Sequence, residues 1–161
     1  MTKLAEIHVE NALAPRFGRG WHCLGEADEY RDGKLHTLNI FGSRLLAYAT
    51  SAGEISVLDA HCPHMGADLS QGTIENDRVV CAFHHWQYDA SGKCVDIPYR
   101  KRIPPKAKTR AWQTCEVNNL LFVWNNPEGK PPADDVVIPH LPEMDSDEWL
   151  HSWHMDKLII N

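Results

Sequence analysis

The chain has 161 residues, which suits one domain with its own hydrophobic core and is too short for two large ones. Hydrophobic residues make up 43% and charged residues 24%, as in ordinary globular proteins. The formal net charge of −6 argues against nonspecific binding to nucleic acid. No apolar run approaches the roughly 20 residues of a membrane span, and the N-terminus lacks the apolar core of a secretory signal. We therefore expect a cytoplasmic protein with no membrane span and no nucleic-acid partner.

Short β-strands separated by turns are the main predicted elements. Residues 1–15 carry little pattern, and we expect a short helix or an ordered arm there. Beyond them, β-prone runs alternate with clusters of turn-forming residues, which is typical of strands in an all-β fold. The expected strands cover 34–41, 44–50, 55–58, 72–77 with a turn at its end, 78–80, 115–117, 120–124 and 148–160.

Prolines and asparagines define the connections of the second half. Residues 97–105 cannot form regular sheet, because proline offers no hydrogen-bond donor to a ladder. Asn118-Asn119 joins two strands and tolerates the left-handed backbone of a tight hairpin. Residues 127–142 are polar and proline-rich, as in a linker or a tail lying on the surface. The sequence therefore predicts an all-β fold, an antiparallel β-sandwich or barrel.

Two short segments each combine one cysteine with one histidine. Cys62-Pro63-His64 is separated by sixteen residues from Cys81-Ala82-Phe83-His84. Thiolate with imidazole favours zinc, copper or iron–sulfur chemistry. A zinc finger usually takes both cysteines from one hairpin and both histidines from one helix. A Rieske [2Fe–2S] cluster instead has two thiolates on one iron and two imidazoles on the other. The mixed pairs favour such a cluster, with Cys62 and Cys81 on the inner iron and His64 and His84 on the outer.

The other cysteines and histidines are expected to have no role as ligands. Cys23, Cys94 and Cys115 are interpreted as reduced, buried or half-buried thiols. His61 and His85 flank ligands whose four positions are already filled, so they are expected to be exposed. His151 and His154 lack a carboxylate partner for an iron site and are taken as ordinary strand residues.

Two further groups of residues have alternative interpretations. Four side chains near the ligands are candidates for fixing the ligand segments, with ordinary packing as the alternative: Asp68, Gln71, Trp86 and Tyr88. A basic run, Arg100-Lys101-Arg102 with Lys106 and Lys108, could receive an acidic redox partner or be a solvated loop.

With these segments in place, the chain resembles the N-terminal Rieske domain of Rieske non-haem iron oxygenases over about residues 16–160. Within that family it is most similar to the branch of the 3-ketosteroid 9α-hydroxylase oxygenase components. Besides the ligands, the matching segments are 19–25, 64–72, 97–99, 102–105, 120–124 and 127–129. Three residues depart from the family pattern: Ala82 replaces a proline, and His85 and Asn119 replace glycines. No ligand is lost, but the backbone at His85 becomes a point to check.

The resemblance implies a Rieske-type fold over 16–127, with a small cluster-binding subdomain made of loops 61–69 and 81–89. An arm over 1–15 would precede it, and a proline-rich tail over 128–161 would lead into a missing catalytic domain. The implied function is one-electron transfer from a reductase or ferredoxin through the cluster to a mononuclear Fe(II) in that missing domain. The full oxygenase would be a homotrimer. The present chain would then hold no catalytic residue and no complete catalytic site, which leaves its status as an enzyme open.

Two other functions remain as alternatives. A free-standing Rieske-type ferredoxin, a diffusible electron carrier, is favoured by the chain's length. The segments before and after the cluster domain favour the oxygenase, because free carriers are usually shorter. A zinc-stabilised binding module ranks below both.

The same resemblance predicts a low reduction potential. High-potential Rieske proteins join the two loops by a disulfide and add a serine hydroxyl donor, but here Ala67, Phe83 and Trp86 stand at those places. Fewer donors stabilise the more negative reduced cluster less. We expect a midpoint potential below zero, toward the low end of the Rieske range of about −150 to +300 mV. A redox titration followed by absorption measures it, and a clearly positive midpoint contradicts the prediction.

Overall fold

The computed structural model describes residues 17–146 and 148. Within that part the chain forms antiparallel strands in three sheets, with three 3-10 turns and no α-helix. No helix there is long and apolar enough to cross a membrane. The expected arm 1–15, nearly all of the expected strand 148–160, and His151 and His154 lie outside the described residues.

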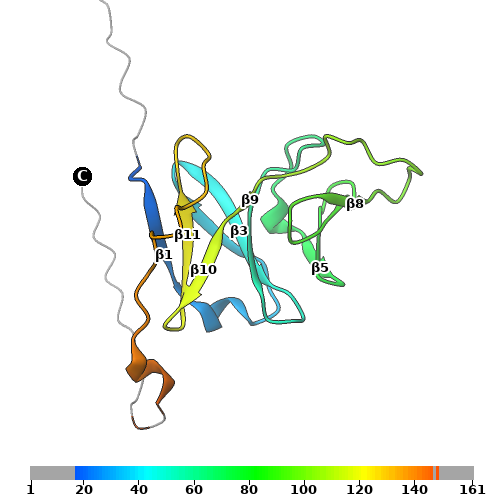
Figure 1. The fold of residues 1–161 in the computed structure, drawn as a ribbon. Coiled ribbons are helices and arrows are strands. Elements are labelled where there is room, and N and C mark those ends of the chain that lie inside the picture. The colour runs from blue at the N-terminus through cyan, green and yellow to red at the C-terminus, as the bar shows by residue number, and fades with distance from the viewer. Residues whose placement is uncertain (1–16, 147, 149–161) are drawn as a thin grey trace, which may run out of the picture.

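Two of the sheets lie at one side of the molecule in Figure 1, and the third is set apart from them beyond β3 and β9. The first sheet has the order β1 (Gly20–Glu26), β11 (Leu120–Asn125), β10 (Thr114–Val117). The second has the order β2 (His36–Ile40), β3 (Ser43–Ala49), β4 (Ile55–Asp59), β9 (Ala111–Trp112). The third has the order β5 (Thr73–Glu75), β6 (Arg78–Val80), β7 (Gln87–Tyr88), β8 (Cys94–Asp96). The 3-10 turns are η1 (Ala27–Tyr30), η2 (Leu69–Gln71) and η3 (Pro142–Asp145).

Strand β3 separates two hydrophobic cores. Because successive side chains of a strand point to opposite faces, Leu45 and Ala47 pack between the first two sheets, whereas Leu46 and Tyr48 pack toward the third. All four side chains are fully buried, which explains the uninterrupted apolar run in the sequence. The core toward the third sheet also contains Cys62 and Cys81, so both predicted cysteine ligands are packed with Leu46 and Tyr48 of β3.

Most predicted elements are confirmed, and the differences are local. Asn118 and Asn119 form the β10–β11 hairpin with φ of +55° and +58°, so Asn119 keeps the conformation of the glycine it replaces. Residues 97–105 form no strand. The first two sheets pack on each other and form a sandwich. The segment after β11 lies on this sandwich: the indole N–H of Trp21 donates to the Val136 carbonyl, and the Asn118 amide donates to the Pro139 carbonyl. Strands β1, β7, β8 and β9 and the 3-10 turns were not predicted. The 3-10 turns and β7 to β9 have two to four residues each, too few for a periodic pattern. In β1, Gly20, Gly25 and the register shift between Cys23 and Gly25 obscure the alternation.

The two ligand loops follow the same backbone path. In the first, the N–H of Cys62 donates to the Ala67 carbonyl, and the N–H of Gly66 donates to the Cys62 carbonyl, both at 2.9 Å. In the second, Cys81 N–H donates to Trp86 O and His85 N–H to Cys81 O, also at 2.9 Å. The fifth residue of each loop has positive φ, +77° at Gly66 and +57° at His85. The histidine therefore adopts the left-handed backbone that glycine favours, and the loop keeps its geometry.

This equivalence predicts unequal effects of two substitutions. A Cβ at Gly66 would lie 3.1 Å from His61 Cε1 on a backbone that L side chains rarely adopt. Gly66→Ala should therefore lower the free energy of unfolding by about 1–2 kcal/mol. His85→Gly relieves the strained backbone of the folded state, but glycine also raises the conformational entropy of the unfolded chain. Because these two effects oppose each other, the free energy of unfolding should change by less than about 1 kcal/mol. Urea unfolding of the two variants measures both values. Equal losses would show that the loops do not share this backbone requirement.

Candidate iron–sulfur centre

The structure brings the four predicted ligands together from loops that follow β4 and β6. Cys62 and Cys81 are each 1% exposed, whereas His64 and His84 are half-buried at the surface. The two imidazole rings lie 4.5 Å apart between centroids, nearly perpendicular to each other. The two sulfur donors thus lie in the core, and the two imidazole rings lie nearer the surface. Burial raises the pKa of the Cys62 thiol above its usual range, the Tyr88 hydrogen bond opposes this, and the neighbouring Cys81 adds to the rise.

The donor set fits a binuclear cluster better than a single zinc ion. Among residues 17–146 and 148, no three His, Cys, Asp or Glu side chains converge where one ion could be held. A structural zinc site needs four such donors around one ion, whereas each iron of a Rieske cluster takes only two from the protein. In addition, His64 Nδ1 is buried and has no hydrogen-bond partner in the structure. Since buried polar atoms are normally satisfied, a bond from this nitrogen to iron would resolve the deficit.

Tyr88 supports the inner end of the site. Its side chain is fully buried, and its hydroxyl lies 3.2 Å from Cys62 Sγ. Burial raises the pKa of Tyr88 well above its usual range, and the Cys62 contact adds to this effect. The phenol therefore stays protonated and donates toward a thiolate at this position. Of the two interpretations of Tyr88, this contact favours a side chain that fixes a ligand segment over ordinary packing.

Trp86 supports the outer end. Its ring stacks on His64 with 4.3 Å between centroids and 12° between planes. Its indole N–H donates to the Tyr99 hydroxyl at 2.6 Å. The orientation of the His64 imidazole is therefore constrained by Trp86, and Tyr99 in turn holds Trp86. The role of Trp86 follows the prediction, whereas Tyr99 was missed as a contact because it lies thirteen residues away in a segment without periodicity.

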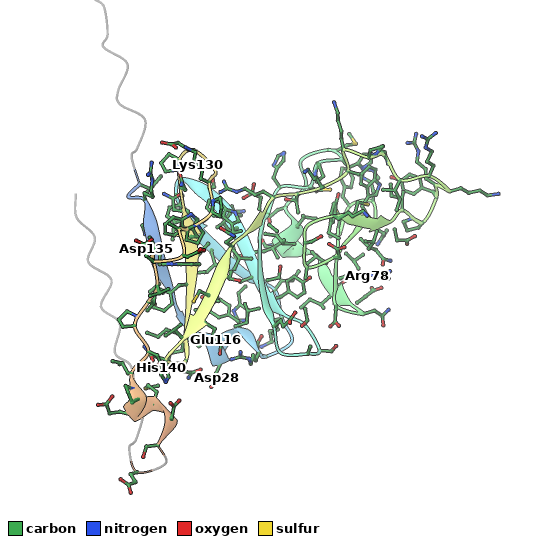
Figure 2. All side chains as sticks on the ribbon, viewed as in Figure 1. Asp28, Arg78, Glu116, Lys130, Asp135 and His140 are labelled. Carbon is green, nitrogen blue, oxygen red and sulfur yellow. The ribbon has the colours of Figure 1, made fainter. Side chains whose placement is uncertain are left out.

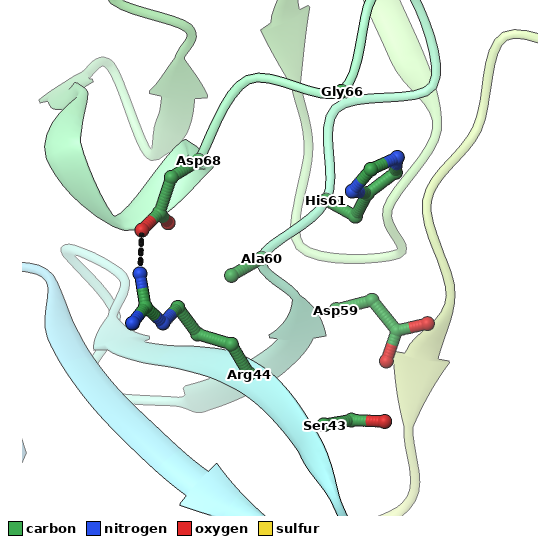
Figure 3. Close-up of a pocket in the computed structure, with 7 residues that line it drawn as sticks. All are labelled: Ser43, Arg44, Asp59, Ala60, His61, Gly66 and Asp68. Atoms are coloured by element: carbon green, nitrogen blue, oxygen red, sulfur yellow. Dashed lines mark hydrogen bonds and ion pairs between the residues drawn. The ribbon is translucent and has the colours of Figure 1, made fainter.

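Asp68 fixes the end of the first loop (Figure 3). It accepts hydrogen bonds from Ser70 N at 2.9 Å and from Arg44 Nη1 at 2.7 Å, which ties the loop to β3. Burial alone would raise the pKa of Asp68, but the bonds from Ser70 and Arg44 outweigh it and hold the pKa below its usual range. Beside this ion pair is a hollow of about 430 Å³, lined by Ser43, Arg44, Asp59, Ala60, His61, Gly66 and Asp68. Gln71 is exposed and donates only a long 3.5 Å bond to Ser70, so it adds little.

The remaining cysteines and histidines mostly lie as expected. His61 and His85 are exposed, and all five cysteines are free thiols. Cys94 is buried and Cys115 is half-buried, but Cys23 is exposed, which corrects the prediction. Cys23 lies on β1 beside a register shift between Cys23 and Gly25, and such an irregularity changes which side chains face the core.

Comparisons with known proteins agree with this geometry. Residues 20–113 match the family described as Rieske [2Fe-2S] domain. A 3-ketosteroid-9-alpha-monooxygenase oxygenase component of Rhodococcus rhodochrous is 51% identical over 160 residues, which cover 99% of this chain and 41% of that protein. One of Mycolicibacterium smegmatis is 50% identical over 149 residues, covering 92% and 39%. The crystal structure of dicamba monooxygenase with non-heme iron and dicamba superposes with a TM-score of 0.70 at 25% identity, covering 80% and 39%.

The chain thus spans about two fifths of the length of the curated relatives it matches. The structural likeness confirms the predicted Rieske-type fold. The family match covers more than half of the chain and includes both cysteine–histidine segments. The chain therefore belongs to the Rieske [2Fe–2S] domain family, whose members carry a [2Fe–2S] cluster.

Proposed function

We propose that this chain is the electron-accepting domain of a steroid-type Rieske oxygenase. The observation that carries the proposal is the combination of two buried thiols and two adjacent half-buried imidazoles on loops of matching backbone. Relatives that are 50–51% identical are oxygenase components of 3-ketosteroid-9-alpha-monooxygenases, and the match extends over 99% of the chain in one of them. A steroid substrate follows from this similarity.

Each residue of the site has a defined part in this function. The bound cluster supplies one-electron transfer, with the electron received on the histidine-ligated iron. Cys62 and Cys81 would hold the inner iron in the dry core, and His64 and His84 would hold the outer iron next to the surface. Trp86 orients the His64 ring, and Tyr88 donates a hydrogen bond toward Cys62. Asp68 and Arg44 keep the first loop attached to the sandwich.

The proposal also implies partners and a further domain. A reductase or ferredoxin would supply the electrons. Residues 16–127 would form the Rieske domain, and residues 128–161 would lead into a catalytic domain with a mononuclear iron, for which the relatives' greater length leaves room. A full-length oxygenase of this kind would be a homotrimer. The coding sequence after Asn161 tests this part directly: two histidines and a carboxylate in frame support the oxygenase.

A free-standing Rieske ferredoxin is the second candidate. It would use the same four ligands and the same electron chemistry. The tail favours the oxygenase, because residues 133–139 pack on the sandwich through Trp21 and Asn118. A stop codon directly after Asn161 in the native gene would instead favour the carrier.

The ligand assignment predicts a sharp difference between neighbouring histidines. His64→Ala and His84→Ala should each abolish the reduced-state EPR signal of a Rieske cluster, because the outer iron would lose one of its two imidazoles. His61→Ala and His85→Ala are matched controls, since both residues are exposed and each is adjacent to a ligand or its cysteine. They should retain the signal and the visible absorption. A colourless protein that contains zinc and no acid-labile sulfide refutes the proposed function.

The Tyr88 contact predicts a shift in reduction potential. A hydrogen bond stabilises the reduced, more electron-rich cluster more than the oxidised one, so Tyr88→Phe should lower the midpoint potential by on the order of 20–60 mV. Tyr48→Phe is the control: Tyr48 is equally buried in the same core, but its hydroxyl bonds the Asp77 carbonyl at 3.0 Å. Redox titration of the two variants should show a change for Tyr88 alone. An equal shift in both would mean that general loosening of the core sets the potential.

A further inference from the structure

The segment between β8 and β9 carries three consecutive cations with no described acidic partner. It extends furthest from the sandwich in Figure 1. Arg100, Lys101 and Arg102 are all exposed, and within residues 17–146 and 148 none of them forms an ion pair. By contrast, five cations on or beside the first two sheets form ion pairs: Arg19, Arg31, Lys34, Arg44 and Lys130. Three consecutive exposed cations thus stand together on a chain with a net charge of −6.

The cationic loop is held in a defined position. Arg100 N–H donates to the Ile97 carbonyl at 3.0 Å, and the Ile97 side chain is 1% exposed, so the start of the loop is anchored in the core. At its end, Ala107 N–H donates to the Pro104 carbonyl at 2.9 Å. Between these anchors is a hollow of about 400 Å³ lined by Arg100, Lys101, Arg102, Pro104 and Pro105. The three cationic residues therefore line a concave surface that can receive an acidic protrusion.

The cationic loop is also adjacent to a proposed ligand. Tyr99, the residue before Arg100, accepts the indole hydrogen bond of Trp86, and Trp86 stacks on His64. Tyr99 is 57% exposed. The residue that begins the loop is thus linked to the His64 imidazole by two direct side-chain contacts, so a partner that touches Tyr99 lies one side chain away from the ring stacked on His64.

Exposed apolar side chains complete this surface. Met65 is 66% exposed and Phe83 is 59% exposed, and each directly follows or precedes a ligand histidine in the chain. With Tyr99 they place an apolar area around the imidazoles, next to the cations. An apolar centre with a charged rim is the usual composition of a protein–protein interface.

We propose that Arg100, Lys101 and Arg102 form the docking site for an acidic electron-donor protein, whose redox group approaches His64 over Tyr99 and Trp86. This rests on the proposed function and adds where the electron enters and what charge the donor carries. An acidic donor and a chain of net charge −6 repel each other at long range, so a local cationic surface is needed to select one orientation. One electron passes from the reduced donor, which is oxidised, to the cluster, which is reduced; no bond forms and no proton moves.

The test compares two triple variants of the cluster-loaded chain with equal net charge. The first is Arg100→Gln with Lys101→Gln and Arg102→Gln. The control is Arg19→Gln with Lys34→Gln and Lys130→Gln, which removes the same charge from the sandwich, where Figure 2 shows Lys130 far from the third sheet. The probe is a reduced plant-type [2Fe–2S] ferredoxin, an acidic protein, mixed by stopped flow. Its affinity for each variant is measured in parallel by calorimetry.

Neutralising the cationic loop should slow the second-order reduction by on the order of tenfold at low salt and weaken ferredoxin binding in proportion. The control should change much less. At 1 M salt, where the Debye length is about 3 Å, the two variants should converge. The spectrum and midpoint potential of the unsubstituted chain are measured first: a chain that holds no Rieske cluster refutes the proposed function, whereas the docking site is tested by the rates of variants whose spectrum and midpoint potential match it.

Two outcomes overturn the docking site while the electron-transfer function stands. If both variants slow equally, the donor responds to net charge and no local site exists. If neutralising the cationic loop changes the mass of the chain in solution, measured by light scattering, and leaves the reduction rate unchanged, the loop contacts a second copy instead.

Discussion

The site depends on placing two thiols in a dry core and two imidazoles at the surface only a few residues away along the chain. A ligand loop can do this only if its cysteine is anchored where a strand ends at the core. Strand β3 makes such a core available, because its alternate side chains fill one core on each face. β4 runs beside it and leads into Cys62, and β6 leads into Cys81. The burial of Tyr88 between these ends then places a hydroxyl at the Cys62 sulfur.

The equivalence of the two loops explains why a histidine is tolerated at position 85. Both loops close by the same pair of backbone hydrogen bonds, so the fifth residue of each must have positive φ. At Gly66 the His61 ring lies against the space that a Cβ would fill, so side chains are excluded there. At His85 the side chain points to solvent, and only the backbone preference is violated. The cost of that conformation is of order 1–3 kcal/mol, which a well-packed core can carry.

The sequence predicts the all-β fold, the β10–β11 hairpin and the grouping of the four proposed ligands, because these features are encoded in local patterns. The cysteine–histidine pairs are informative since their mixed order excludes the commoner zinc arrangement. Contacts across long sequence separations could not be predicted in the same way. Arg44 with Asp68 and Trp86 with Tyr99 depend on how two strands and a proline-rich loop fold back, for which no local signal exists. Cys23 was expected to be buried because cysteine usually is, but an irregular register on an edge strand exposes it.

The two imidazoles have different neighbours, so the surface around His64 differs in charge from the surface around His84. His64 is covered by Trp86, which links it to Tyr99 and the cationic loop. His84 instead packs against the exposed Phe83, with 4.0 Å between ring centroids. The loop that carries both residues, 81–89, contains no lysine or arginine. A charged surface suits a transient partner that must associate and dissociate in each cycle, since electrostatic attraction raises the association rate more than it prolongs the complex. The charged part of the proposed docking surface therefore lies on the His64 side, and the exposed Met65 and Phe83 continue it as an apolar area next to the two imidazoles.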